Sequence, residues 1–181
     1  VVRQYDARET RRNFKEWSVK GDGMLMMVHE GPVGRVAAEV EAVDVLAAQC
    51  GLTRADDQVA AHWMENRNHV PSWTELFDQD LVVDTIEISG SWSNIELIYD
   101  QSIADVSAVE GVVAVSAHSS HAYRTGVNLY FTFAGLSDDP QVLENIYLAC
   151  WHAVMEATAA HGGGVAHHHG LGRVRKPYLV H

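Results

Sequence analysis

Apolar and polar residues alternate most clearly in the second half of the chain. Two largely apolar segments, residues 112–118 and 127–133, flank a turn over residues 123–126. Strand side chains point alternately to the two faces of a sheet, so this pattern predicts an antiparallel hairpin. The apolar side chains of the second strand share one face: Val127, Leu129, Phe131 and Phe133.

The polar residues of that strand fall on the other face. Asn128, Tyr130 and Thr132 occupy the alternate positions, so Tyr130 is predicted to lie on the polar side. If the turn is centred near Arg124, His118 lies opposite Tyr130 on the same face. The pair depends on register, because a shift of one residue would separate the two side chains.

The rest of the chain predicts a mixture of strands and helices. Short apolar runs indicate three further strands: residues 1–5, 24–28 and 82–89. Within the charged segment 6–20, residues 11–15 are interpreted as a solvated hairpin connection. Apolar spacing and caps predict four helices: residues 33–50, Asp56 to Arg67, one capped by Ser91, and one from Pro140 to Gly162. Because hairpin connections dominate, we expect an α+β domain over residues 1–181, with an antiparallel sheet and helices packed on one face.

Two expectations about burial follow from the helical patterns. Cys50 and Cys150 fall within predicted helices and are expected to be reduced and buried. The last helix is expected to bury an apolar stripe made of Val142, Ile146, Ala149 and Ala153.

The composition is typical of a folded domain without a nucleic-acid partner. The 181 residues are 47% hydrophobic and 20% charged, as in ordinary globular proteins. A net charge of −11 argues against DNA or RNA as a partner. No apolar run reaches the roughly 20 residues of a membrane span, so we expect a soluble protein. Both ends are interpreted as cuts through a longer chain.

Three consecutive histidines, His167, His168 and His169, follow the glycine-rich end of the last predicted helix. A purification tag is the simplest interpretation, but globular sequence continues beyond them. In a metal site, His167 and His169 would share the ion while His168 pointed away. We favour an active-site loop, in which imidazoles form hydrogen bonds and stabilise charge.

Tyr130 is interpreted as an acid or base that works together with these histidines. A phenol has a reference pKa of about 10, so it needs nearby positive charge or donors to act near neutral pH. Arg67, His118 and Arg173 are candidates for contacting an anionic substrate, although both arginines fit equally well as solvated residues. Glu87, in the strand at 82–89, is interpreted as structural.

Three segments resemble the C-terminal part of the alkyldihydroxyacetonephosphate synthase group of FAD-linked oxidases. The most specific is His-His-His-Gly-Leu-Gly-Arg-Val-Arg-Lys at residues 167–176. The second is residues 123–133, in which Tyr130 matches the proposed acid/base of that group and precedes His167 by 37 positions. The third is residues 84–94, and the resemblance extends over nearly the whole chain.

The resemblance implies a ferredoxin-like cap domain that covers an FAD. The FAD would be held mainly by an N-terminal FAD-binding domain, which is absent from this chain. The resemblance also implies exchange of the acyl group of acyl-dihydroxyacetone phosphate for an alkyl group, in ether-lipid synthesis. Tyr130 would move a proton at the substrate carbon, and His167 to His169 would stabilise oxygen charge. A lipid-like anionic substrate, peripheral membrane proximity, a homodimer and a cytoplasmic location, peroxisomal in a eukaryote, are further expectations. The isolated chain is expected to be inactive.

Two departures from related sequences bear on this interpretation. Many relatives carry Arg-Asp shortly after the proline that ends the second helix, where this chain has Pro-Ser-Trp-Thr-Glu at residues 71–75. Arg67 is the candidate replacement for that arginine. Related 2-hydroxy-acid dehydrogenases show G-D-G-N-L-H, whereas residues 126–130 read G-V-N-L-Y. Tyrosine replaces their metal-associated histidine, which favours a site without metal.

Two other functions stay open. The cap of an FAD-linked oxidase or dehydrogenase of a hydroxy acid or alcohol would use the same residues and pass a hydride to the flavin. A stand-alone metal- or anion-binding module is the alternative from a different class.

Overall fold

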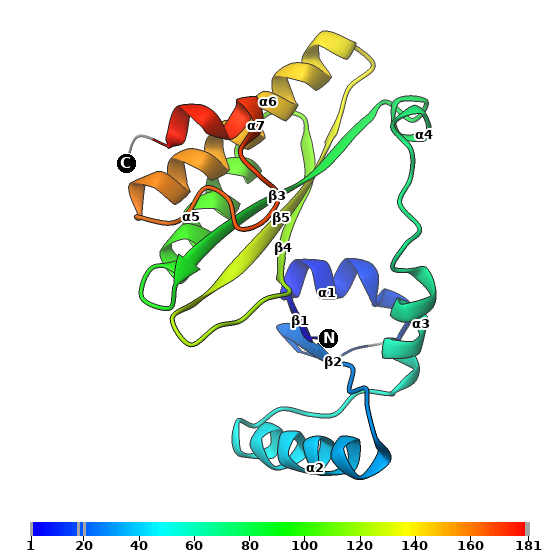
Figure 1. Ribbon diagram of the computed structural model, residues 1–181. Coiled ribbons are helices and arrows are strands. Elements are labelled where there is room, and N and C mark those ends of the chain that lie inside the picture. Colours follow the sequence, from blue (N-terminus) through cyan, green and yellow to red (C-terminus); the bar gives the residue numbers. More distant parts are fainter. Residues whose placement is uncertain (1, 18, 20, 180–181) are drawn as a thin grey trace.

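The computed structural model describes residues 2–17, 19 and 21–179, without the side chain of Glu16. Predictions that involve Val1, Ser18, Lys20, Val180 or His181 lie outside the described residues. The strands are β1 (Val2–Asp6), β2 (Gly23–Met27), β3 (Leu81–Ser91), β4 (Val112–Ser119) and β5 (Gly126–Leu136). The α-helices are α1 (Ala7–Asn13), α2 (Val33–Gln49), α3 (Gln58–Asn66), α4 (Trp73–Phe77), α5 (Ile95–Ser107), α6 (Pro140–Ala160) and α7 (Gly172–Arg175), with 3-10 helices η1 (Lys15–Trp17) and η2 (Lys176–Tyr178) (Figure 1).

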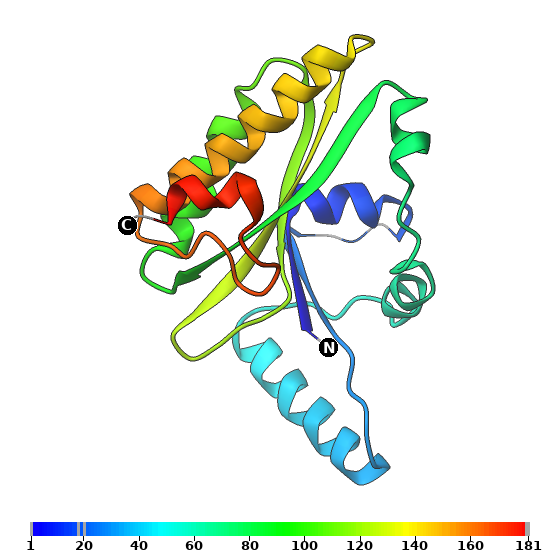
Figure 2. The ribbon, with the colours of Figure 1, turned by 45° about the horizontal axis from the view of Figure 1, so that its top comes forward.

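The five strands form one antiparallel sheet in the order β2-β1-β4-β5-β3. β4 and β5 form the predicted hairpin. α5 and α6 cover one face of the sheet over β3, β4 and β5 (Figures 1 and 2). The predicted α+β class with an antiparallel sheet is therefore confirmed. β2 is an edge strand in which only Met26 is buried, whereas a buried strand was expected there.

The main core lies between the sheet and α5 and α6. It includes the large buried side chains Ile86, Ile88, Ile98, Val106, Phe131, Phe133, Ile146, Val154 and Met155. Each buried side chain of this size stabilises the fold by about 1.5–3 kcal/mol. The predicted inward face of β5 is correct, since Phe131 and Phe133 are each 1% exposed. The opposite face of the central strands is thereby left for polar side chains.

The charged segment after β1 contains a helix, which contradicts the predicted hairpin connection. Asp6 caps α1 by accepting a hydrogen bond from the Glu9 N–H at 2.7 Å. α1 lies on the face of the sheet opposite α5 and α6 (Figure 2). The arginines near its end are exposed, but Glu9 and Thr10 are buried. The prediction failed because those arginines mark only the solvent side of a short helix.

A second, smaller core lies on this face of the sheet. Its buried members are Tyr5, Phe14, Met26 and Val59. Trp63 of α3 packs against this cluster. α1 and α3 therefore occupy the part of this face over β1 and β2.

Three helices differ from their predicted patterns, and two more were not predicted. α2 spans the expected residues, but none of them is buried and Cys50 is exposed, because α2 stands apart from the sheet (Figure 1). Asn94, not Ser91, precedes α5. Val142 of α6 is 41% exposed, and the buried stripe of α6 includes Leu143, Ile146, Cys150, Trp151 and Val154. Two short helices, α4 and α7, were not predicted. Neither α6, with 21 residues, nor any other described helix is long and apolar enough to cross a membrane.

Substitutions at two glycines, Gly126 in β5 and Gly34 in α2, test how closely β5 approaches β3. A Cβ atom added to Gly126 would lie within 2.0 Å of the Gly90 carbonyl oxygen, so Gly126→Ala should lower the free energy of unfolding by about 1–3 kcal/mol. Gly34→Ala in α2 meets nothing within 4 Å and should stabilise by about 0.5–1 kcal/mol through helix propensity. Urea denaturation measures both. Equal stability of the two variants would contradict the strand pairing.

Candidate active site

A row of four side chains crosses the face of the sheet opposite α5 and α6. The register pairs Tyr5 with His118, His118 with Tyr130, and Tyr130 with Glu87, and residues paired in antiparallel strands share a face. The His118 and Tyr130 rings stack with centroids 4.9 Å apart. The predicted pair of His118 and Tyr130 is therefore confirmed. We call these four residues the polar row.

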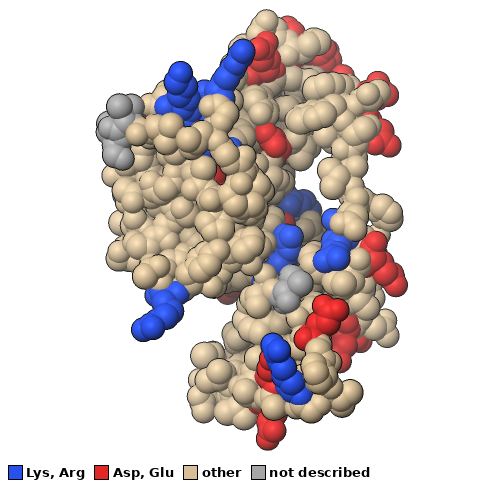
Figure 3. Space-filling view, in the orientation of Figure 1, with Lys and Arg blue, Asp and Glu red and all other residues tan. Residues whose placement is uncertain are grey.

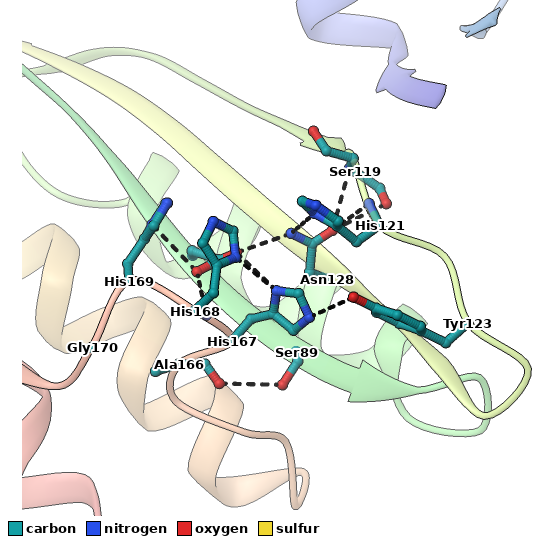
Figure 4. Close-up of polar contacts among 12 residues, drawn as sticks. Ser89, Ser119, His121, Tyr123, Asn128, Ala166, His167, His168, His169 and Gly170 are labelled. Atoms are coloured by element: carbon teal, nitrogen blue, oxygen red, sulfur yellow. Dashed lines mark hydrogen bonds and ion pairs between the residues drawn. The ribbon is translucent and has the colours of Figure 1, made fainter. Parts of the chain in front are cut away.

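The three histidines reach this face because the chain turns around the edge of the sheet after α6. Gly164 exchanges two backbone hydrogen bonds with Ser89 of β3, at 2.7 and 2.9 Å. The segment 167–169 then lies beside β3 and β5 on the side of the polar row (Figure 4). Beyond the segment, Arg175 donates a hydrogen bond to the Glu87 carbonyl oxygen at 3.3 Å. Both ends of the loop are thus attached to β3.

Glu87 is the centre of the site. Its side chain is 0% exposed, and the Nδ1 atoms of His167, His168 and His169 lie 3.3, 2.9 and 3.3 Å from its carboxylate oxygens. The Asn128 amide donates to it at 3.1 Å and the His168 backbone N–H at 3.3 Å. A buried carboxylate requires such partners. Glu87 therefore determines where the imidazoles lie.

Glu87 is ionised at neutral pH. Burial by itself would raise the pKa of this carboxyl. Hydrogen bonds from Asn128, the His168 backbone and Tyr130, together with positive charge at His169, outweigh burial and lower its pKa to about 2. The site therefore has a fixed negative charge beneath three imidazoles.

Tyr130 contacts the same cluster and is held as a neutral phenol. Its ring centroid lies 5.6 Å from that of His169 and 6.4 Å from that of His168. Burial first, and then the hydrogen bond to Glu87 and the charge of that carboxylate, raise the pKa of Tyr130 to about 12. We expected the histidines to lower the pKa of Tyr130. The negative charge of the Glu87 carboxylate acts in the opposite direction and raises it.

The three histidines differ in how their ring nitrogens are used. His167 contacts Glu87 through Nδ1 and the Tyr123 hydroxyl through Nε2, the latter at 3.0 Å. The side chains of His168 and His169 are 47% and 45% exposed. Among the described residues no hydrogen bond involves their Nε2 atoms. His167 is thus positioned through both nitrogens, whereas His168 and His169 can meet a substrate.

The structure does not bring Arg67 and Arg173 to this cluster. Arg67 is exposed at the end of α3, with its guanidinium 5.6 Å from the Trp63 ring. Arg173 is exposed in α7. No hydrogen bond, ion pair or ring contact within the described ranges joins either to Tyr130 or the histidines. The buried arginine of that basic run is Arg175, which stacks 4.8 Å from the Trp151 ring.

Two groups of side chains have a spacing that would suit a metal ion. They are His121 with His167 and His168, and Glu87 with His168 and His169, each with ligand atoms within 4.8 Å of one another. Sequence alternation suggested that His168 would point away, but His168 belongs to both groups. The segment bends at each histidine, so the alternation of an extended strand does not apply.

The sequence analysis interpreted Glu87 as structural and did not predict that it holds the three histidines, nor that Asn128 and His121 lie at the same cluster. The one indication in the sequence was the position of Glu87 between the apolar residues Ile86 and Ile88, which places its carboxylate on the face of the sheet opposite the core. Nothing local in the sequence indicated that a segment 80 positions later would cover Glu87.

Comparison with known proteins gives a consistent picture. Residues 2–181 match the family described as FAD linked oxidases, C-terminal domain. The chain is 27% identical over 189 residues to the uncharacterized FAD-linked oxidoreductase YgcU of Escherichia coli K12, covering 97% of this chain and 39% of YgcU. It is 28% identical over 178 residues to alkyldihydroxyacetonephosphate synthase of Trypanosoma brucei brucei, covering 91% of this chain and 28% of that protein.

Solved structures agree on the fold. One structure of alkyldihydroxyacetonephosphate synthase superposes with a TM-score of 0.72 at 22% identity, covering 98% of this chain and 37% of the other. A second gives 0.63 at 23% identity, covering 91% and 34%. This chain thus spans well under half the length of the proteins that it matches.

Glu87→Gln tests the buried charge. Because its pKa is lowered, ionised Glu87 stabilises the fold at pH values above the ordinary glutamate pKa of 4.5, and this contribution is lost as the pH falls toward about 2. The shift corresponds to about 3 kcal/mol. The variant should lose about this much unfolding free energy at pH 7 and progressively less toward pH 3.

Urea denaturation over this pH range measures the difference. Glu110→Gln, at an exposed position, is the control and should change stability by less than about 0.5 kcal/mol. A deficit in Glu87→Gln that does not vary with pH would show that charge is not the cause.

Proposed function

Because the chain belongs to the family of C-terminal domains of FAD-linked oxidases, we propose that it forms the substrate-facing wall of a flavoenzyme active site. The proposed reaction resembles that of alkyldihydroxyacetonephosphate synthase, the exchange of an acyl for an alkyl group on acyl-dihydroxyacetone phosphate. The observation that carries this proposal is the cluster of Tyr130 and three histidines around Glu87. The matched synthase sequences support the choice of reaction.

The residues present fit a flavin that another part of the protein holds. The exposed imidazoles of His168 and His169 lie beside Tyr130, which is itself 8% exposed, so a flat ring system in contact with these imidazoles would lie next to the phenol. We assign no residue of this chain to holding the FAD. When bound, the flavin would supply the redox-active ring system, while the protein orients the substrate and stabilises charge.

Tyr130 would donate and recover a proton at the reacting substrate carbon. Its raised pKa keeps the phenol protonated at rest, and a phenolate beside Glu87 would be a strong base. Proton transfer from the phenol must therefore be met by a compensating positive charge. The neighbouring imidazoles are the groups that can carry it.

His168 and His169 would stabilise oxygen charge that develops on the substrate. With Nδ1 directed at Glu87, an imidazolium presents its Nε2–H to the substrate. Fixed donors of this kind stabilise an anionic oxygen more than its neutral precursor. His167, held by Tyr123 and Glu87, would keep the segment in place.

A second function shares the same residues. The match to YgcU, whose name gives an FAD-linked oxidoreductase, supports an oxidase or dehydrogenase of a hydroxy acid or alcohol. In that reaction the flavin, when bound, would supply the hydride acceptor, and a base of this chain would have to take the hydroxyl proton of the substrate. The phenol, once deprotonated, or an imidazole would take the proton.

Replacing Tyr130 with Phe removes only the phenolic oxygen. In the complete enzyme, Tyr130→Phe should lower kcat for acyl exchange by roughly 100- to 10,000-fold, because the proton donor is lost. Circular dichroism should still show a folded protein, with a stability lowered by about 1–3 kcal/mol because Glu87 loses one hydrogen bond. Tyr147→Phe is the matched control, since burial raises the pKa of Tyr147 to about 12 as well but this residue lies on α6. Full activity of Tyr130→Phe would remove Tyr130 from the mechanism.

Flavin absorbance separates the two reactions. In the complete enzyme under anaerobic conditions, acyl exchange should proceed with a labelled fatty alcohol and leave no net reduction of the flavin. Bleaching by a hydroxy acid such as lactate, without exchange, would instead assign the oxidase function. Stoichiometric zinc that depends on His167 and His168 would contradict both and favour a metal-binding module.

A further inference from the structure

One arginine lies on the same face as the polar row without an acidic partner. Arg3 precedes Tyr5 by two residues in β1, so the two side chains share a face of the sheet. Its Nη1 donates a hydrogen bond to Nε2 of His118 at 2.8 Å. Its guanidinium also lies 5.2 Å from the Trp63 ring. Arg3 is therefore held between a strand and a helix.

The donors of Arg3 are only partly used. Its Nε–H is buried and has no hydrogen-bond acceptor among the described residues. Within the same part of the chain no carboxylate lies within 4.0 Å of Arg3, so the charge of the guanidinium is not neutralised by an ion pair.

The hydrogen bond to His118 fixes the orientation of the guanidinium. Arginine can only donate, so His118 accepts at Nε2 and carries its hydrogen on Nδ1. That Nδ1 lies 3.2 Å from the buried carboxylate of Glu9. The chain of contacts from Glu9 through His118 to Arg3 holds the guanidinium, and leaves its remaining N–H groups to meet a ligand.

Arg3 is also close to the proposed reacting groups. The His118 ring that Arg3 contacts stacks on Tyr130, and the charge of Arg3 acts on Tyr130 in the direction of a lower pKa. Figure 3 shows this side of the molecule hollowed between the sheet and the segment that carries α3 and α4, with Lys and Arg side chains along the hollow. An anion bound by Arg3 would be separated from Tyr130 by the His118 ring.

We propose that Arg3 binds the anionic group of the substrate, a phosphate monoester or a carboxylate, in the place that Arg67 and Arg173 were expected to take. Two N–H groups of a guanidinium match two oxygens of either anion. This inference rests on the proposed function in placing the substrate on the polar row. It assigns the anion to β1, at the opposite end of the row from Glu87.

Equilibrium binding to the complete flavoenzyme tests this assignment without turnover. Glycerol 3-phosphate and lactate are the probes, titrated by calorimetry, and the one that binds identifies the class of anion. Arg3→Gln should raise its Kd roughly 10- to 100-fold, the loss expected for hydrogen bonds to a charged group. Arg3→Lys, which keeps the charge without the planar fork, should give a smaller increase.

Arg54→Gln removes an exposed cation elsewhere and should leave Kd unchanged. Arg67→Gln tests the competing residue over the same indole. An unchanged Kd in Arg3→Gln, a larger effect of Arg67→Gln, or no binding of either probe to the wild-type enzyme would overturn the assignment. Tyr130→Phe should still bind the probe, so loss of turnover there leaves this test independent of the proposed reaction.

Discussion

The hydrogen bonds to the Glu87 carboxylate connect distant parts of the chain. A charge moved out of water costs several kcal/mol unless polar groups replace its hydration. Here the replacement comes from Asn128 of β5 and from the His168 backbone, 81 positions away in the sequence. Without the histidine segment the carboxylate would be left with too few partners. Folding of the edge of the sheet and assembly of the site are therefore one physical event.

The period of two along the strands explains why a core and a site coexist in one sheet. Ile86 and Ile88 point into the core, so Glu87 between them points away from it. In the same way, Leu129 and Phe131 point into the core and Tyr130 between them points away. α5 and α6 cover the apolar side. α1, α3 and the histidine segment border the other, and the polar row lies between them. Arg175 stacks on Trp151 of α6 and donates a hydrogen bond to the Glu87 carbonyl oxygen, so it links the histidine segment to the apolar side of the sheet.

Sequence reasoning succeeded where the determining interactions are local. Strict alternation over residues 127–133 and a turn of defined length were enough to give the hairpin, and with it His118 opposite Tyr130. It failed for α1, whose cap at Asp6 outweighs a run of charges. It also failed for Glu87 and Arg3, because their significance depends on partners that the fold brings from 41 to 115 positions away.

The backbone pairing of Gly164 with Ser89 affects whether the edge strand β3 can pair with a second molecule. β3 is an outer strand of eleven residues, and the free backbone groups of such a strand invite pairing with a second chain. The turn after α6 satisfies some of those groups near the C-terminal end of β3. The loop that presents the imidazoles also covers unpaired backbone groups of β3, so damage to it would favour self-association as well as loss of the histidine cluster around Glu87.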